Sequence, residues 1–81
     1  MELIETTRGH LRVRDGERTA TIYGEAFLRG HESPDFLVYS NSLDKWDPPN
    51  DGEKIPDETK KKLLQFLREE FIRKNMTLEI E

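Results

Sequence analysis

The chain has 81 residues, enough for a single domain (residues 1–81) with a modest hydrophobic core. Charged residues make up 37% of the chain, the formal net charge is −4 and there is no cysteine. This composition excludes a disulfide-stapled fold and a thiolate metal site, and a negative field of this kind disfavours direct binding to nucleic acid.

The first part of the chain predicts β-strands. A short strand in "ELIETT" is followed by "HLRVRD", where Leu11 and Val13 alternate with arginines. Asp15-Gly16 then predicts a hairpin turn, because glycine accepts the positive φ of tight turns. Over residues 19–28 small and apolar side chains share one parity, and threonines and aromatic residues occupy the other. Gly24, in the middle of this strand, indicates a bulge or a close backbone approach.

The second part adds a strand, a helix and a last strand. "FLVY" is apolar on both faces, which is typical of a central strand, and a turn is expected before it in "GHESPD". From Asp57 to about Lys74 the pattern predicts a helix, whose apolar stripe is formed by Leu63, Leu64, Leu67 and Phe71 and widened by Phe66. "MTLEIE" then closes the chain as a strand. The order β-β-β-β-α-β predicts an α+β fold: a small, mostly antiparallel, four- to five-stranded twisted sheet with one α-helix packed on one face.

An acidic, proline-rich stretch, "SLDKWDPPNDGEKIPDE", separates the fourth strand from the helix. It holds the only tryptophan and six of the seventeen acids. Prolines cannot donate backbone hydrogen bonds, so the strand ends before Pro48-Pro49 and the chain leaves the sheet stiffly. Trp46 is either a structural plug at one end of the core or a binding anchor. Both interpretations are compatible with acidic side chains that form a rigid rim. The predicted partner-binding residues are Asp44, Trp46, Asp47, Asp51 and Glu53.

The sequence does not favour catalysis or metal binding. His10 and His31 stand near predicted strand ends without partners at metal-ligand spacing, and we expect them in surface turns. There is no glycine-rich phosphate loop and no nucleophile elbow. A small hydrolase that uses an aspartate or histidine would need a pKa-shifted acid in a cleft. We therefore expect no enzyme, no cofactor and no metal.

Several segments, taken in order, resemble the immunity protein 74 family of bacterial polymorphic-toxin systems. They are "RGHLRV", "ATIYGEAFL", "FLVYSNSLDKWDPP", "IPDETKKKLLQFL" and "LEIE". The matching features are Gly24-Glu25 in an early strand, the serines of 40–42, the Trp-x-Pro-Pro of 46–49 and a helix with an acidic start at Asp57. Pro56 departs from the pattern, since a capping serine or threonine is expected there. The resemblance implies a cytoplasmic inhibitor of a cognate toxin, and such toxins are often nucleases with basic active-site faces.

Two functions are therefore weighed. The first is an immunity protein that binds a basic cognate toxin through the acidic segment, with the sheet face of Tyr23/Phe27 or Tyr39 as a second contact. The alternative is a small accessory or regulatory subunit that acts as a homodimer, paired through its open sheet face or an edge strand. No apolar run approaches the ~20 residues of a membrane span. The N-terminus has no signal-peptide pattern. We expect a cytoplasmic protein with no membrane or nucleic-acid partner.

Overall fold

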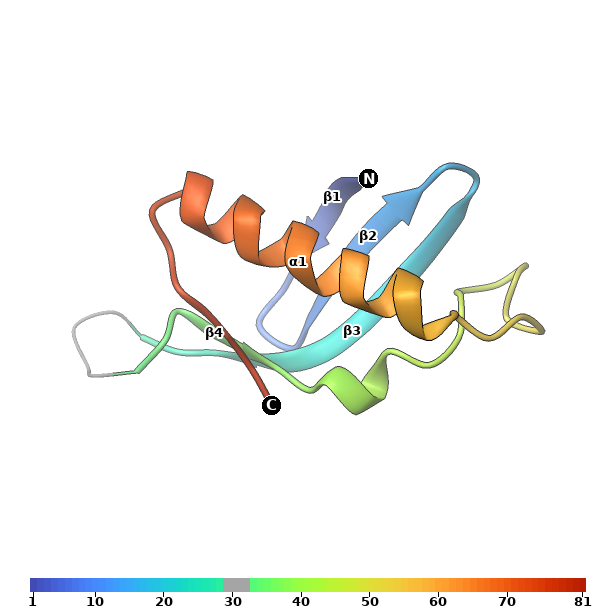
Figure 1. The fold of residues 1–81 in the computed structure, drawn as a ribbon. Coiled ribbons are helices and arrows are strands. Elements are labelled where there is room, and N and C mark those ends of the chain that lie inside the picture. The colour runs from blue at the N-terminus through green and yellow to red at the C-terminus, as the bar shows by residue number, and fades with distance from the viewer. Residues whose placement is uncertain (29–32) are drawn as a thin grey trace.

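A computed structural model describes residues 1–28 and 33–81 and shows one sheet covered on one face by one helix (Figure 1). The sheet has five strands in the order β1-β2-β3-β4-β5. The strands are β1 (Glu2–Thr6), β2 (His10–Asp15), β3 (Arg18–Ala26), β4 (Phe36–Val38) and β5 (Leu78–Ile80). Neighbouring strands are antiparallel except β4 and β5, which are parallel because helix α1 (Asp57–Arg73) connects them. The predicted fold class and element order are confirmed.

The predicted hairpin joins β2 to β3. Gly16 has a φ of 65°, the left-handed conformation for which glycine is suited. The turn sets a register in which Val13 lies opposite Ala20 and Leu11 opposite Ile22, and all four side chains are buried. The alternation expected from the sequence thus fixes which face of the sheet becomes the core.

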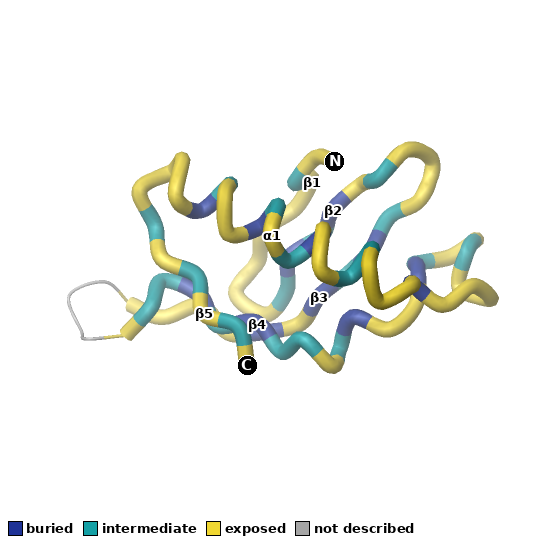
Figure 2. The backbone as a smooth tube through the Cα atoms, in the orientation of Figure 1, coloured by how far each residue is buried: buried dark blue, intermediate teal, exposed yellow. Residues whose placement is uncertain are grey.

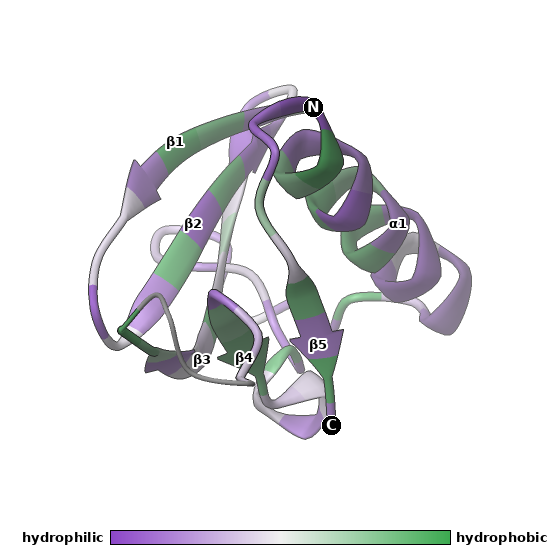
Figure 3. Cartoon of the chain, turned by 90° about the vertical axis from the view of Figure 1, so that its left-hand side faces the viewer, coloured by the Kyte–Doolittle hydropathy of each residue, from purple (hydrophilic) through white to green (hydrophobic). Residues whose placement is uncertain are grey.

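The core lies between the sheet and the helix. Figure 3 shows the two layers edge-on, and Figure 2 shows that the buried positions of the strands and of α1 face each other. Of the predicted helical stripe, Leu63, Leu67 and Phe71 are buried, and Leu64 and Phe66 are partly buried against the same core. Phe71 meets Phe36 of β4 edge to face, with 6.2 Å between the ring centroids. The other face of the sheet is polar and is not covered by α1, and Tyr23 stands on it 55% exposed.

Gly24 confirms the predicted close backbone approach. A Cβ atom there would lie 2.0 Å from the carbonyl oxygen of Leu37 on β4. The strand expected after Asp35 is shorter than the apolar run suggested, because β4 ends at Val38 and a 3-10 turn, η1 (Ser40–Ser42), follows. The predicted turn at residues 30–35 is described only from residue 33, and His31 lies outside the described residues.

Helix α1 begins without a side-chain cap. Pro56 occupies the N-cap position, as its departure from the family pattern predicted, and Asp57 and Glu58 supply negative charge in the first turn instead. At the other end Asn75 adopts a positive φ of 59°, and the next residue, Met76, donates its N–H to the Phe71 carbonyl at 2.8 Å. This turn sends the chain into β5.

Candidate functional site

The acidic stretch folds into a short hairpin, residues 44–55, at one end of the sheet (Figure 1). The Ile55 N–H donates to the Asp44 carbonyl at 2.9 Å, and the Trp46 N–H donates to the Glu53 carbonyl at 3.3 Å. At the tip the Asn50 N–H donates to the Asp47 carbonyl at 2.9 Å across Pro48-Pro49, and the Glu53 N–H donates to the Asn50 carbonyl at 3.0 Å, which makes the turn predicted at Asn50 to Gly52. The 44–55 hairpin is therefore ordered in advance of any binding event, and this reduces the entropy lost on binding.

Trp46 closes one end of the core. Its side chain is 7% exposed and belongs to the same buried cluster as Leu43 and Ile55. The interpretation of Trp46 as a structural plug is confirmed. The small exposed part of Trp46 lines two hollows at the surface, one with Tyr23 and Pro48 and the other with Arg18 and Pro56.

Asp47 fastens the hairpin to the sheet. Its carboxylate accepts the hydroxyl of Thr19 at 3.0 Å, the hydroxyl of Thr21 at 2.9 Å and Nε of Arg12 at 3.3 Å. Its backbone N–H also donates to the Thr19 carbonyl at 2.8 Å. The side chain is only 16% exposed. The sequence indicated Asp47 as a site residue but not its three partners. Thr19 and Thr21 do lie among the alternate positions of the predicted strand that face solvent.

These contacts predict that Asp47 is needed for stability. Asp47→Ala should lower the free energy of unfolding by about 1.5–3 kcal/mol, because hydrogen bonds to a charged group are lost and Arg12 keeps only Glu5, 3.9 Å away. Asp51→Ala should change it by less than about 0.5 kcal/mol, since that side chain is exposed. Chemical denaturation followed by Trp46 fluorescence compares the two variants. Equal stabilities would show that the Asp47 contacts do not hold the hairpin.

Glu53 is also engaged, but at the surface. Nε and the Nη2 atom of Arg18 donate to its two carboxylate oxygens at 2.9 and 3.1 Å, a two-pronged pair. Donation from Arg18 lowers the pKa of Glu53 below its ordinary value of 4.5. The pair therefore contributes stability above pH 4.5 that is lost as the pH falls through the lowered pKa.

The titration of Glu53 tests this pair. In the wild-type chain the carboxyl carbon of Glu53 should titrate with a midpoint below 4.5, and Arg18→Gln should return it toward 4.5. Arg14→Gln is the matched control, since Arg14 pairs with Glu2 and not with Glu53. NMR of the side-chain carboxyl signals gives both midpoints. A midpoint that Arg18→Gln leaves in place would contradict the assignment.

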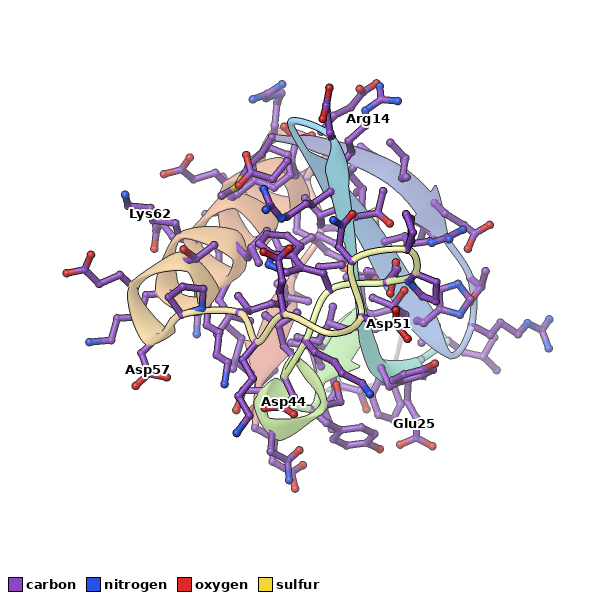
Figure 4. The ribbon with its side chains drawn as sticks, turned by 90° about the vertical axis from the view of Figure 1, so that its right-hand side faces the viewer. Arg14, Glu25, Asp44, Asp51, Asp57 and Lys62 are labelled. Carbon is purple, nitrogen blue, oxygen red and sulfur yellow. The ribbon has the colours of Figure 1, made fainter. Side chains whose placement is uncertain are left out.

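Asp44 and Asp51 are the acids of the hairpin that remain available (Figure 4). Asp51 is exposed, and no residue in the described parts of the chain pairs with it. The Asp44 side chain is 59% exposed and shares Lys60 with Asp57, Nζ lying 3.9 Å from each carboxylate. Of the predicted acidic rim, Asp47 and Glu53 therefore hold the hairpin to the sheet, and Asp44 and Asp51 face solvent.

The motif residues that carry the family resemblance serve the scaffold. Gly24 allows β4 to approach, and Glu25 accepts the hydroxyl of Tyr39 at 3.0 Å, which raises the pKa of Tyr39. Ser42 accepts the Tyr23 N–H at 2.9 Å and donates to the Tyr39 carbonyl at 2.6 Å, so its hydroxyl replaces a ladder hydrogen bond at the edge of β3. These roles explain why the pattern accompanies this fold.

No group of three or more metal-binding side chains occurs within 1–28 and 33–81. His10 lies at the start of β2 rather than in a turn, with Nε2 2.6 Å from a Glu5 carboxylate oxygen, and this hydrogen bond lowers the pKa of Glu5. None of the helices in the same ranges has the length and hydropathy of a membrane span.

The fold defines the class of protein: a small α+β domain built from one five-stranded sheet and one helix. The family model of Immunity protein 74 matches residues 3–81. The chain belongs to the immunity protein 74 family. An immunity protein neutralises a toxin as a non-enzymatic inhibitor, so the partner of this chain is a cognate toxin. No curated protein and no solved structure matches the chain.

Proposed function

We propose that the chain neutralises a nuclease-type toxin in the cytoplasm by binding a basic face of that toxin with the 44–55 hairpin. Asp44 and Asp51 make the direct contacts in this proposal. Trp46, Asp47 and Glu53 hold the hairpin in the shape that presents them. The carrying observation is that Asp51 is an exposed carboxylate on a hairpin closed by its own hydrogen bonds.

Charge supports a basic partner. Residues 41–58 carry six acids and two lysines, a local charge of −4, whereas residues 59–81 carry a net positive charge. A negative end of the molecule attracts a positive protein surface and speeds encounter, and this attraction weakens as salt screens it. A nuclease surface shaped for phosphates offers such positive charge, and carboxylates at that surface would exclude the nucleic acid.

The experiment begins with the toxin. Tagged chain expressed in its native host is used to capture its partner, which mass spectrometry identifies, and the two are then co-expressed to measure growth. Wild-type chain should abolish the toxicity. Asp44→Asn with Asp51→Asn should weaken binding about 10- to 100-fold, chiefly through slower association at low salt. Glu69→Gln with Glu79→Gln removes the same charge from exposed positions elsewhere and should bind like wild type.

Two results would contradict the proposal. Equal loss of affinity in both double variants would show that net charge, and not the hairpin, drives binding. A toxin domain with no nuclease activity would refute the toxin type while leaving toxin neutralisation in place.

A homodimeric accessory subunit is the second candidate. One observation favours it: Ile72 is 73% exposed on α1, beside a shallow hollow that Met76 and Leu78 also line next to edge strand β5. Analytical ultracentrifugation distinguishes the two candidates. A concentration-independent monomer that binds the toxin one to one rejects the dimer, and a dimer disrupted by Ile72→Asp supports it.

A further inference from the structure

A groove of about 330 Å³ lies between the 44–55 hairpin and the edge of β3. Its origin is visible in the hydrogen bonds. The chain after β4 is joined to β3 at Tyr23, through the Tyr39 N–H and the Ser42 hydroxyl, and again at Thr19, through the Asp47 N–H. Between these two points the chain bows away from the strand, and Thr21 lines the hollow that results.

The lining combines aromatic and apolar walls with negative charge. Tyr23, 55% exposed, forms one wall, and the edge of Trp46 and the ring of Pro48 form others. Asp44 and Asp51 lie at the rim, and Lys45 is the only cation of the lining. Asp47 also contributes, but its oxygens are occupied by the threonines and Arg12. Because Asp47 is already paired with Arg12, Asp44 and Asp51 against Lys45 leave the lining with a net negative charge, which disfavours an anion and favours a cation.

The size of the groove restricts the occupant. Pockets that enclose small-molecule ligands measure roughly 300–1,000 Å³. This groove is at the lower limit and is open to solvent, so it suits one side chain of a partner better than a separate ligand. A side chain with an apolar stem and a cationic head uses all parts of the lining: the stem lies along Pro48 and Trp46, and the head meets a ring face and a carboxylate.

We propose that this groove receives one arginine side chain of the cognate toxin, with its guanidinium stacked on Tyr23 and donating to Asp51. The inference rests on the proposed function and names the contact at its centre. Arginine is preferred over lysine because its planar group both stacks on an aromatic ring and donates two hydrogen bonds to one carboxylate. A basic nuclease face presents such side chains to its substrate, and the groove would sequester one of them.

The test uses two independent readouts. The first titrates wild-type chain with N-acetyl-arginine amide and follows the NMR signals of the Tyr23 ring and the Trp46 indole. The citrulline analogue is the matched control, because it has the same shape without the charge. The arginine probe should produce saturable shifts that Asp51→Asn abolishes, and the citrulline analogue should produce none. No shift with either probe, or equal shifts with both, would overturn the inference.

The second readout is the affinity for the captured toxin. Tyr23→Ala and Asp51→Asn should each weaken binding by about tenfold or more, as expected for an anchor at the centre of an interface. Glu79→Gln should leave the affinity unchanged. Circular dichroism confirms that each variant is folded. Unchanged affinity in Tyr23→Ala together with a loss in Asp51→Asn overturns the groove and leaves the proposed function intact, whereas unchanged affinity in both variants also contradicts the direct contact proposed for Asp51. Absence of neutralisation by wild type overturns the proposed function itself, and the groove inference with it.

Discussion

Leu67→Ala should lower the free energy of unfolding by about 2–5 kcal/mol, the range for removal of a fully buried leucine side chain. Leu67 is 0% exposed at the middle of the buried stripe of α1, between Leu63 and Phe71. A domain of this size has a total stability of only about 4–12 kcal/mol, at roughly 0.05–0.15 kcal/mol per residue. The substitution should therefore unfold a substantial fraction of the protein at about 37 °C.

Ile72→Ala is the matched control on the same helix. Ile72 is 73% exposed, so its truncation should cost less than about 0.5 kcal/mol. Urea denaturation followed by Trp46 fluorescence measures both variants, since Trp46 is buried in the same core. Comparable losses in the two variants would show that α1 does not pack on the sheet through the Leu67 stripe.

Gly24→Ala should be the second most damaging single change, at or above the upper end of the about 1–3 kcal/mol that overpacking costs. The added Cβ would lie 2.0 Å from the Leu37 carbonyl oxygen and 2.9 Å from Cα of Val38, so backbone atoms must move. β3 and β4 are joined by three residue pairs, Gly24↔Val38 being the first, and displacement of β4 would also disturb its parallel partner β5.

Gly9→Ala is the matched control for this prediction. Gly9 lies just before β2 and its carbonyl accepts the Gly24 N–H at 3.0 Å, but a Cβ on Gly9 meets nothing within 4 Å. Thermal unfolding of the two variants should separate clearly. Hydrogen exchange should show faster opening of β4 and β5 in Gly24→Ala alone. A Gly24→Ala variant as stable as Gly9→Ala would mean that β4 can shift without cost.

The Gly24→Ala prediction bears on the proposed function through the position of the 44–55 hairpin. The chain leaves β4, makes η1 and is fastened to the edge of β3 before it enters the 44–55 hairpin. Displacement of β4 by Gly24→Ala would disturb the hydrogen bonds that Tyr39 and Ser42 make with the backbone of Tyr23. Because Tyr23 forms one wall of the groove, the shape of the groove would change. We therefore expect Gly24→Ala to weaken toxin binding even at temperatures where the chain remains folded.

The elements of this fold could be predicted from the sequence because their signals are local. Alternation in β2 and β3, the Asp15-Gly16 turn and the leucine stripe of α1 each depend on residues a few positions apart. The same holds for the exit from the sheet, where Pro48-Pro49 ends backbone pairing. The presence of an acidic, preordered segment between sheet and helix was also predictable. The end of β4 was not, because the Ser42 hydroxyl takes over a backbone hydrogen bond that the strand would have made.

The roles of the acidic residues were decided by tertiary structure. In the sequence Asp44, Asp47, Asp51 and Glu53 are equivalent members of one charged run. In the folded chain the carboxylate of Asp47 accepts hydrogen bonds from side chains that lie between 26 and 35 positions earlier in the sequence. Glu53 pairs with Arg18, 35 positions earlier, and Asp51 is exposed to solvent. Partners at such separations depend on the register of β2 and β3 and on the path of the hairpin. Local sequence therefore determined where the negative charge is concentrated, and only the packing of distant segments determined which carboxylates are free to bind.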